Sequence, residues 1–236
     1  MPSDSPVAII TGASSGIGLA VAHALHDRGW RLALVARNEQ RLQSAAAELS
    51  GDALPLLLSA DVGRIDDVDR IVTQTLERFG RIDALVNNAG TAPLHTIEET
   101  SLAVIESAYR VNAIGPAALI SLIWPEFIRH KGGCVVNVST MGTADPFPGF
   151  FAYASSKAAT NLMALACANE GAEHGIRAFA VAPGAVETPM LRSLFDEKRI
   201  PSEQCLTPDD VASVIVECIL GGRDDENGQT IFLSKT

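Results

Sequence analysis

Tyr153 and Lys157 are the residues with the clearest chemical potential, and they stand four positions apart in the Ala- and Leu-rich run 151–170. This run contains neither Pro nor Gly, so we expect a helix. Residues four apart lie on one helix face, which brings the phenol and the ammonium together. An ammonium stabilises the phenolate, so the pair predicts a Tyr153 pKa below its usual value of about 10. That suits general acid–base catalysis, although a half-buried Tyr beside a solvated Lys is the alternative.

A glycine turn follows the first apolar run of the chain. Val7 to Ile10 leads into Thr11-Gly12-Ala13-Ser14-Ser15-Gly16-Ile17-Gly18, and an amphipathic segment continues to residue 27. Strand, glycine turn and helix in this order predict a dinucleotide site, because glycines let the backbone approach a pyrophosphate at the positive end of a helix. A tight turn made only for its geometry is the alternative.

The second predicted strand, residues 31–36, ends about 20 residues past the glycine turn, where an NAD site places a carboxylate on the ribose. The chain has Ala36 there, followed by Arg37. No carboxylate is available for a 2′-hydroxyl, whereas a guanidinium can pair with a 2′-phosphate. The pattern favours NADP over NAD, with an ordinary solvated Arg37 as the alternative.

Apolar runs alternate with helical segments along the rest of the chain. Further strands are predicted at residues 54–59, 82–86, 134–138, 176–181 and 229–233, and helices at 38–49, 65–79, 102–129, 151–170 and 208–220. We therefore expect an α/β fold, a doubly wound (Rossmann-like) parallel sheet of about seven strands with helices on both faces, in a single domain of residues 1–236.

Two polar features interrupt this apolar pattern. Asn87-Asn88-Ala89-Gly90 follows a strand, which suits a loop touching a ligand or a turn made for its geometry. Asn112 lies inside a predicted helix beside Gly115 and Pro116, where a polar, helix-weakening residue is costly without a task.

Composition narrows the function classes. The chain has 236 residues, 47% of them hydrophobic and 19% charged, which indicates a folded core. A net charge of -10 without a basic cluster disfavours nucleic acid and anionic membranes as partners. Four widely spaced cysteines indicate free thiols, and five histidines without ligand spacing indicate no metal. A polar start and the absence of an apolar run of membrane-spanning length lead us to expect a cytoplasmic protein.

These motifs, in this order and spacing, resemble the short-chain dehydrogenase/reductase family over nearly the whole chain. The resemblance is carried by Thr11-Gly12-x-x-x-Gly16-Ile17-Gly18, Asp61-Val62, Asn87-Asn88-Ala89-Gly90, Asn112, Tyr153-x-x-x-Lys157 and Pro183-Gly184. It implies hydride transfer between NADPH and a ketone or secondary alcohol, and a homodimer or homotetramer. An NADP-binding regulatory protein without turnover is the alternative.

The resemblance also implies a role for each matched position. Tyr153 would be the general acid–base residue, Lys157 would bind the nicotinamide ribose, and Asn112 would hold a water in a proton relay. The residues expected to contact the cofactor are Gly12, Ser14, Ser15, Gly16, Ile17, Gly18, Arg37, Asp61, Val62, Asn88, Ala89, Gly90, Tyr153, Lys157, Pro183, Gly184, Val186 and Thr188.

The hydroxyl expected to bind the substrate oxygen follows the fifth strand. The family's Ser lies thirteen positions before the Tyr, and this position holds Thr140, preceded by Ser139. Side chains alternate along a strand, so the two cannot both face the nicotinamide. We therefore assign Thr140 to the substrate oxygen and Ser139 to a hydrogen bond within the scaffold. An apolar set of loop residues near this position predicts a mostly apolar carbonyl substrate: Pro93, Leu94, Met141, Phe147, Phe150, Met190 and Leu191. The family resemblance also implies a 3-oxoacyl-type substrate as an alternative.

Overall fold

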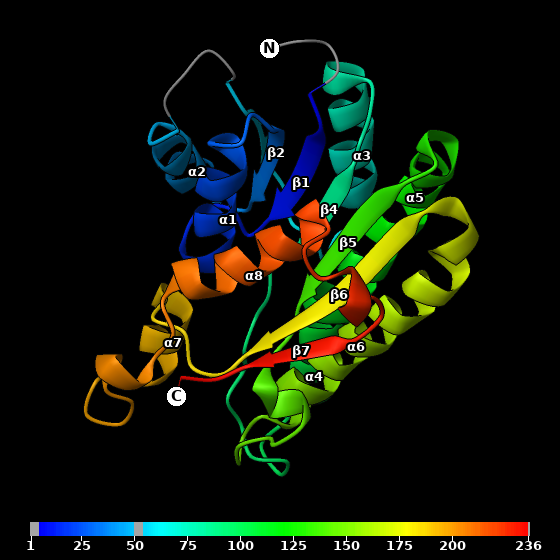
Figure 1. Ribbon diagram of the computed structural model, residues 1–236. Coiled ribbons are helices and arrows are strands. Elements are labelled where there is room, and N and C mark those ends of the chain that lie inside the picture. Colours follow the sequence, from blue (N-terminus) through cyan, green and yellow to red (C-terminus); the bar gives the residue numbers. More distant parts are fainter. Residues whose placement is uncertain (1–4, 50–53, 236) are drawn as a thin grey trace.

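The computed structural model describes residues 5–49 and 54–235, so the polar start of the chain, residues 1–4, lies outside the described part. Seven parallel strands form one sheet in the order β3-β2-β1-β4-β5-β6-β7 (Figure 1). The strands are β1 (Val7–Thr11), β2 (Arg31–Ala36), β3 (Leu56–Ser59), β4 (Ala84–Asn87), β5 (Gly133–Val138), β6 (Ile176–Pro183) and β7 (Thr230–Leu233). The predicted doubly wound parallel sheet is confirmed.

Helices cover both faces of the sheet (Figure 1). One face carries α1 (Gly16–His26), α2 (Glu39–Ala46) and α8 (Pro208–Leu220), and the other carries α3 (Ile65–Phe79), α4 (Leu102–Tyr109), α5 (Gly115–His130) and α6 (Phe151–Gly171). Because strand side chains alternate, Ala8 and Ile10 of β1 enter the core under α1 and α8, and Ile9 enters the core under α3 and α5. Strands buried on both faces explain the continuous apolar runs in the sequence.

Local sequence signals set several helix ends. The Asn38 side chain accepts a hydrogen bond from Arg41 N at 2.9 Å and caps α2, while Gly80 ends α3 with φ 76°. The short helix α7 (Pro189–Leu194) was not predicted, although Thr188 and Pro189 form a regular helix start. Its six residues are too few to show a helical period.

The helix predicted over residues 102–129 is not one regular α-helix. A π-helical turn, Arg110–Ile114, separates α4 from α5. Pro116 has no N–H to donate to the carbonyl of Asn112, and the Gly115 N–H donates to Arg110 O, five residues back. A Cβ at Gly115 would lie 2.3 Å from Val62 O, so this position needs glycine for the close approach.

The expectation that no apolar run is long enough to span a membrane is wrong for this helical run. Leu102–His130 is 29 residues long and contains an 18-residue window with a mean hydropathy of 1.4, and it is the one such helix among the described residues. Its inner side, with Leu119, Ile123 and Phe127, is buried against the sheet. The run is therefore a core helix of this fold.

Candidate active site

One large cavity lies along the carboxyl ends of the strands, where the strand order reverses between β1 and β4. Its volume is about 960 Å³. In open parallel sheets, ligands bind at this edge and at this reversal. All but two of the predicted site residues line the cavity, the exceptions being Gly18 and Asn112.

The glycine turn forms one end of the cavity, and at two of its positions a side chain would clash with neighbouring atoms. Gly12 has φ +67°, and a Cβ on it would lie 2.7 Å from the Asn88 side-chain nitrogen. A Cβ on Gly18 would lie 2.5 Å from both that nitrogen and Gly12 O. Gly18 therefore permits close packing behind the turn instead of facing the cavity. Among the described residues of the first turn of α1 none is acidic, so the positive helix end faces the cavity uncompensated.

Thr11 and Asn88 bind the glycine turn to the loop after β4. The Asn88 and Ala89 amides each donate to Thr11 Oγ1 at 3.0 Å. The Asn88 side chain donates to the carbonyls of Thr11 and Gly12 at 2.9 and 3.1 Å. Sequence reasoning placed Asn88 on the ligand and did not assign Thr11, yet these bonds make both residues a brace between β1 and β4.

Arg37 and Asp61 flank the cavity at the ends of β2 and β3. The Arg37 side chain is exposed, and within residues 5–49 and 54–235 no carboxylate or carbonyl pairs with its guanidinium. Asp61 Oδ1 accepts a hydrogen bond from Gly63 N at 2.9 Å. This end of the cavity thus offers one unpaired cation.

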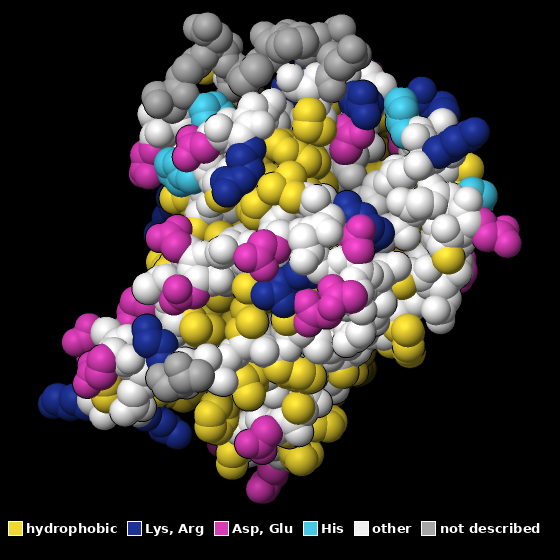
Figure 2. All heavy atoms as spheres, viewed as in Figure 1, with side chains coloured by type: hydrophobic (Ala, Val, Ile, Leu, Met, Phe, Trp, Pro, Cys, Tyr) yellow, Lys and Arg dark blue, Asp and Glu magenta, His cyan; other side chains and the backbone are white. Residues whose placement is uncertain are grey.

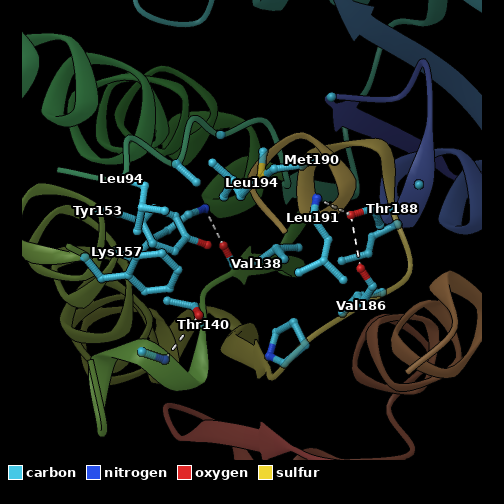
Figure 3. Close-up of a pocket in the computed structure, with 18 of the residues that line it drawn as sticks. Leu94, Val138, Thr140, Tyr153, Lys157, Val186, Thr188, Met190, Leu191 and Leu194 are labelled. Atoms are coloured by element: carbon cyan, nitrogen blue, oxygen red, sulfur yellow. Dashed lines mark hydrogen bonds between the residues drawn. The ribbon is translucent and has the colours of Figure 1, made fainter. Parts of the chain in front are cut away.

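Tyr153 and Thr140 both line the cavity (Figure 3). The Thr140 side chain acts on the Tyr153 phenol, and Thr140 Oγ1 accepts a hydrogen bond from Gly142 N at 3.1 Å. Burial raises the pKa of Tyr153, and the Thr140 hydrogen bond opposes that shift. The sequence predicted that Lys157 lowers the pKa of Tyr153, and this is wrong for the groups that the chain itself provides, because burial of the phenol raises its pKa.

Lys157 lies one helical turn below Tyr153 and is buried, with 5% of its surface exposed. Its Nζ donates to Val138 O at 2.6 Å, the dashed line between these residues in Figure 3. Burial lowers the pKa of Lys157 to about 8. The half-buried Tyr with a solvated Lys, considered as an alternative, is therefore excluded.

Ser139 and Asn112 lie beside this pair. The Ser139 hydroxyl is buried without a hydrogen-bond partner among the described residues, so the predicted scaffold hydrogen bond is wrong. The Asn112 amide nitrogen donates to Thr91 O at 2.8 Å and Ser156 Oγ at 2.9 Å, and its Oδ1 accepts from Thr91 N at 2.9 Å. Both polar atoms of the Asn112 side chain are therefore hydrogen-bonded, and they join the loop after β4 to α6.

The other end of the cavity is mostly apolar, although the Arg199 guanidinium lies 5.2 Å from the ring centroid of Phe195 there. Phe150 stacks edge-on against Tyr153 with ring centroids 5.1 Å apart, and its ring lies 6.5 Å from that of Phe195. Helix α7 turns further side chains toward the same space (Figure 3). The apolar lining residues at this end are Leu94, Phe147, Phe150, Met190, Leu191, Leu194, Phe195 and Ile200. Sequence reasoning missed Leu194, Phe195 and Ile200, because α7 and the stretch after it were not predicted.

The described part of the chain contains no candidate metal site. No group of three or more His, Cys, Asp and Glu side chains there is arranged to hold an ion. The four cysteines are free and buried.

Comparisons with known proteins agree with this geometry. Residues 6–199 match the family model for short chain dehydrogenases. The chain is 34% identical to the 2-(R)-hydroxypropyl-CoM dehydrogenase of Xanthobacter autotrophicus, covering 93% of this chain and 92% of that protein. It is 32% identical to an uncharacterized oxidoreductase of Staphylococcus epidermidis, covering 78% and 79% of the two chains.

A solved structure shares the whole fold. The 3-ketoacyl-(acyl-carrier-protein) reductase of Brucella melitensis, complexed with NADH, superposes with a TM-score of 0.90 at 30% identity, covering 97% of this chain and 96% of that one. The chain belongs to the short-chain dehydrogenase family and is an oxidoreductase.

Proposed function

We propose that this chain is a single NADP-dependent oxidoreductase domain that transfers a hydride between the nicotinamide and a ketone or secondary alcohol. The observation that carries the proposal is the position of Tyr153, Thr140 and Lys157 between the glycine-turn end and the apolar end of one cavity. A cofactor at the first end and a carbonyl compound at the second would meet beside the phenol.

The residues present fit a nicotinamide dinucleotide. A side chain at Gly12 or Gly18 would clash with the loop after β4 or with the turn itself, so both glycines keep the turn tight, and the positive end of α1 faces the cavity where a pyrophosphate would lie. Arg37 would pair with a 2′-phosphate and Asp61 and Val62 would flank the adenine, while Val186 and Thr188 would lie beside the nicotinamide. When bound, the cofactor supplies or accepts the hydride.

The chain's own residues would move the proton. In the reduction direction, Tyr153 donates its proton to the oxygen of the carbonyl, on which negative charge develops. Thr140 donates a hydrogen bond to the same oxygen, so charge is stabilised where it forms. Lys157, ionised below pH about 8, would attract the phenolate that remains.

Asn112 would contribute to the proton relay through its backbone carbonyl. Its side-chain amide already binds Thr91 and Ser156, and it does not line the cavity. Pro116 leaves the Asn112 carbonyl without the usual helical donor. A carbonyl without this donor could accept a hydrogen bond from a relay water instead.

We propose a mostly apolar carbonyl compound, of ketone or 3-oxoacyl type, as the substrate. Eight apolar residues wall the end of the cavity beyond Tyr153, among them Leu94, Phe150 and Phe195. The structural relative from Brucella reduces a 3-ketoacyl group, as its name states. Following nicotinamide absorbance with NADPH and a panel of ketones of increasing chain length tests the proposal. Tight NADPH binding without turnover of any ketone or alcohol would favour a regulatory protein instead.

The cofactor preference is tested at Arg37. An Arg–phosphate pair is worth roughly 1.5–3 kcal/mol, about ten- to a hundred-fold in affinity. We expect NADPH to bind more tightly than NADH by that factor, and Arg37→Ala to remove most of the difference without changing the melting temperature. Titration of both reduced cofactors against native chain and variant measures it. Equal affinities in the native chain would contradict the preference.

We also propose a homodimer or homotetramer built on the outer faces of α4, α5 and α6. Large apolar side chains are exposed there, including Leu102, Ile114, Leu162 and Leu165. Figure 2 shows hydrophobic side chains gathered below β7. An exposed apolar patch of this kind marks an association site, and twofold symmetry is the usual closure. Sedimentation at micromolar concentration should give a dimer or tetramer, and monomer alone would exclude it.

A further inference from the structure

The apolar wall over Tyr153 is a nearly independent piece of chain. It runs from Pro189 to Gln204 and contributes Leu191, Leu194 and Phe195 to the cavity. Within the described residues, its hydrogen bonds stay inside the segment Glu187–Cys205. Among the described residues, its apolar side chains pack against Leu94, Phe150, Tyr153 and Ala154 at the edge of the sheet.

The two ends of the wall are held together by backbone pairing. Glu187 N donates to Leu206 O, and Leu206 N donates to Ala185 O, both at 2.9 Å. Val186 and Leu206 form an isolated parallel bridge. The two ends of the segment are therefore held side by side. The position of α7 and of the stretch after it then depends on contacts between those two parts.

Arg192 of α7 joins the two halves of this segment, and 22% of its side chain is exposed. Its guanidinium binds Glu187 through two bonds, Nε to Oε1 at 2.7 Å and Nη2 to Oε2. Nη1 donates to Ile200 O at 2.8 Å. One planar group thus joins the chain before α7 to the chain after it, in the forked geometry that only Arg provides.

The same guanidinium covers a buried thiol. Nη2 lies 3.1 Å from Ser202 Oγ and 3.8 Å from Cys205 Sγ, and Cys205 is only 2% exposed. The hydrogen bonds from Arg192 lower the pKa of Glu187 to about 2, so the pair stays ionised at any working pH. Because the Cys205 sulfur is buried beneath this guanidinium, its reaction with a thiol reagent measures whether the segment opens.

We propose that Arg192, held by Glu187, is the positioning residue that keeps the apolar wall closed over Tyr153 and so sets the affinity for the carbonyl substrate. Arg192 itself does not line the cavity. Its removal would free α7 and the stretch after it to move away from Phe150 and widen the site where the apolar part of the substrate lies. The statement about substrate affinity depends on the proposed function, whereas closure of the wall does not.

Two measurements on Arg192→Met test this. Labelling of Cys205 by a thiol reagent should speed up at least tenfold, because local opening exposes the sulfur. With NADPH and the best ketone of the panel, KM should rise about tenfold while kcat changes less than twofold. The reason is that the substitution removes the charge-assisted hydrogen bonds that hold the wall and leaves Tyr153 unchanged. NADPH affinity should stay within twofold.

Matched variants separate this from a general loss of stability. Arg223 also binds two carboxylates, Glu217 and Glu226, each at 2.7 Å, and does not line the cavity. Arg223→Met should therefore leave both Cys205 labelling and KM unchanged. Cys205→Ser should abolish the labelling, which assigns it among the four thiols. Arg192→Lys, which keeps the charge without the fork, should label at an intermediate rate.

A folded Arg192→Met chain whose Cys205 labels at the native rate overturns the proposal, whatever its activity. Faster labelling with an unchanged KM overturns the link to the substrate. If Arg192→Met does not fold, Glu187→Gln decides, because it removes the charge with little change of shape: faster labelling supports the closure and native labelling refutes it. If no ketone is turned over, the proposed function fails, and the labelling result still judges the closure.

Discussion

The two ends of the cavity are built in opposite ways. The glycine-turn end consists of backbone from β1, β2 and β4, braced by hydrogen bonds from Thr11 and Asn88. The apolar end consists of side chains from three loops and α7, joined by aromatic contacts around Phe150 and by the ion pair of Arg192 with Glu187. The glycine-turn end is held by the sheet. The apolar end is formed largely by a segment whose hydrogen bonds, among the described residues, are made within the segment.

This difference follows from what each end would bind under the proposed function. A pyrophosphate at the positive end of α1 requires a tight turn, and the Gly12 and Gly18 positions have no room for a side chain. An apolar substrate requires only volume and the absence of unpaired polar groups, which many residue combinations provide. The first requirement therefore fixes residue types, whereas the second leaves them free. Tyr153 and Thr140 stand where the two ends meet.

The largest expected effect is at that junction. Thr140→Ala removes the donor to the substrate oxygen and should lower kcat by about 10²–10³, the usual result of losing one oxyanion donor. NADPH affinity should hardly change, because the donor acts on the substrate and not on the cofactor. Thr140→Ser should keep much of the activity, since Ser also donates and accepts. Steady-state kinetics with cofactor titration measures both quantities.

Ser139 provides the control for this prediction. Its hydroxyl is buried without a hydrogen-bond partner among the described residues, whereas the Thr140 side chain lines the cavity and acts on the Tyr153 phenol. Ser139→Ala should therefore be nearly as active as the native chain. If Ser139→Ala were inactive and Thr140→Ala active, the side chain acting on the substrate oxygen would be one position earlier than the structure indicates.

The fold was predictable because the inner strands, such as β1, β4 and β5, are buried on both faces and so give uninterrupted apolar runs. Helix α3 was predicted at its observed ends, since Gly80 stops it with a left-handed φ. The π-helical turn at Arg110–Ile114 was not predicted. Gly115 and Pro116 signalled a disturbance, but whether a helix widens or breaks there depends on packing against Val62, which local sequence does not contain.

The same limit applies within the site. The spacing of Tyr153 and Lys157 correctly placed both on one face of α6, but it could not show that burial outweighs the ammonium in setting the Tyr153 pKa. Burial depends on Phe150 and Phe195, whose ring contacts join segments about 45 positions apart in the chain. Spacing predicts which groups meet; the surrounding medium decides their protonation.

A pair of glycine variants tests the contrast between the two ends. A Cβ at Gly18 would lie 2.5 Å from Gly12 O, a backbone atom that cannot move without shifting the turn. Gly18→Ala should therefore destabilise the turn by about 1–3 kcal/mol and weaken NADPH binding roughly tenfold or more. Isothermal titration of the variant with NADPH, together with its melting curve, measures both effects.

Gly149→Ala is the matched change at the apolar end. Its Cβ would meet Leu94 Cδ1 at 2.8 Å, the tip of a side chain that can turn away, although φ +97° adds strain of about 1–2 kcal/mol. This variant should raise KM for the ketone and leave NADPH affinity near native. If both variants weakened NADPH equally, the cavity would respond as one unit and the distinction between its ends would be lost.

The smallest effect concerns stability and arises from Lys157. Burial lowers its pKa from 10.5 to about 8, so between these values the unfolded chain binds more protons than the folded chain. Folding stability from this group therefore rises with pH across that window, and the burial penalty is fully present below pH about 8. The shift corresponds to about 3 kcal/mol. Loss of the hydrogen bond to Val138 O offsets about 1–2 kcal/mol of that in a variant.

Lys157→Met should therefore be inactive yet more stable than the native chain by about 1–2 kcal/mol at pH 7, as expected where a catalytic group is held at the expense of the fold. Its advantage should shrink steadily from pH about 8 to 10.5, because only the native chain carries the titrating amine. Urea unfolding of both chains across this range gives the difference directly. A difference independent of pH would mean that the Lys157 ammonium reaches solvent or an anion in the folded chain, and that the junction of the two ends is less dry than its burial indicates.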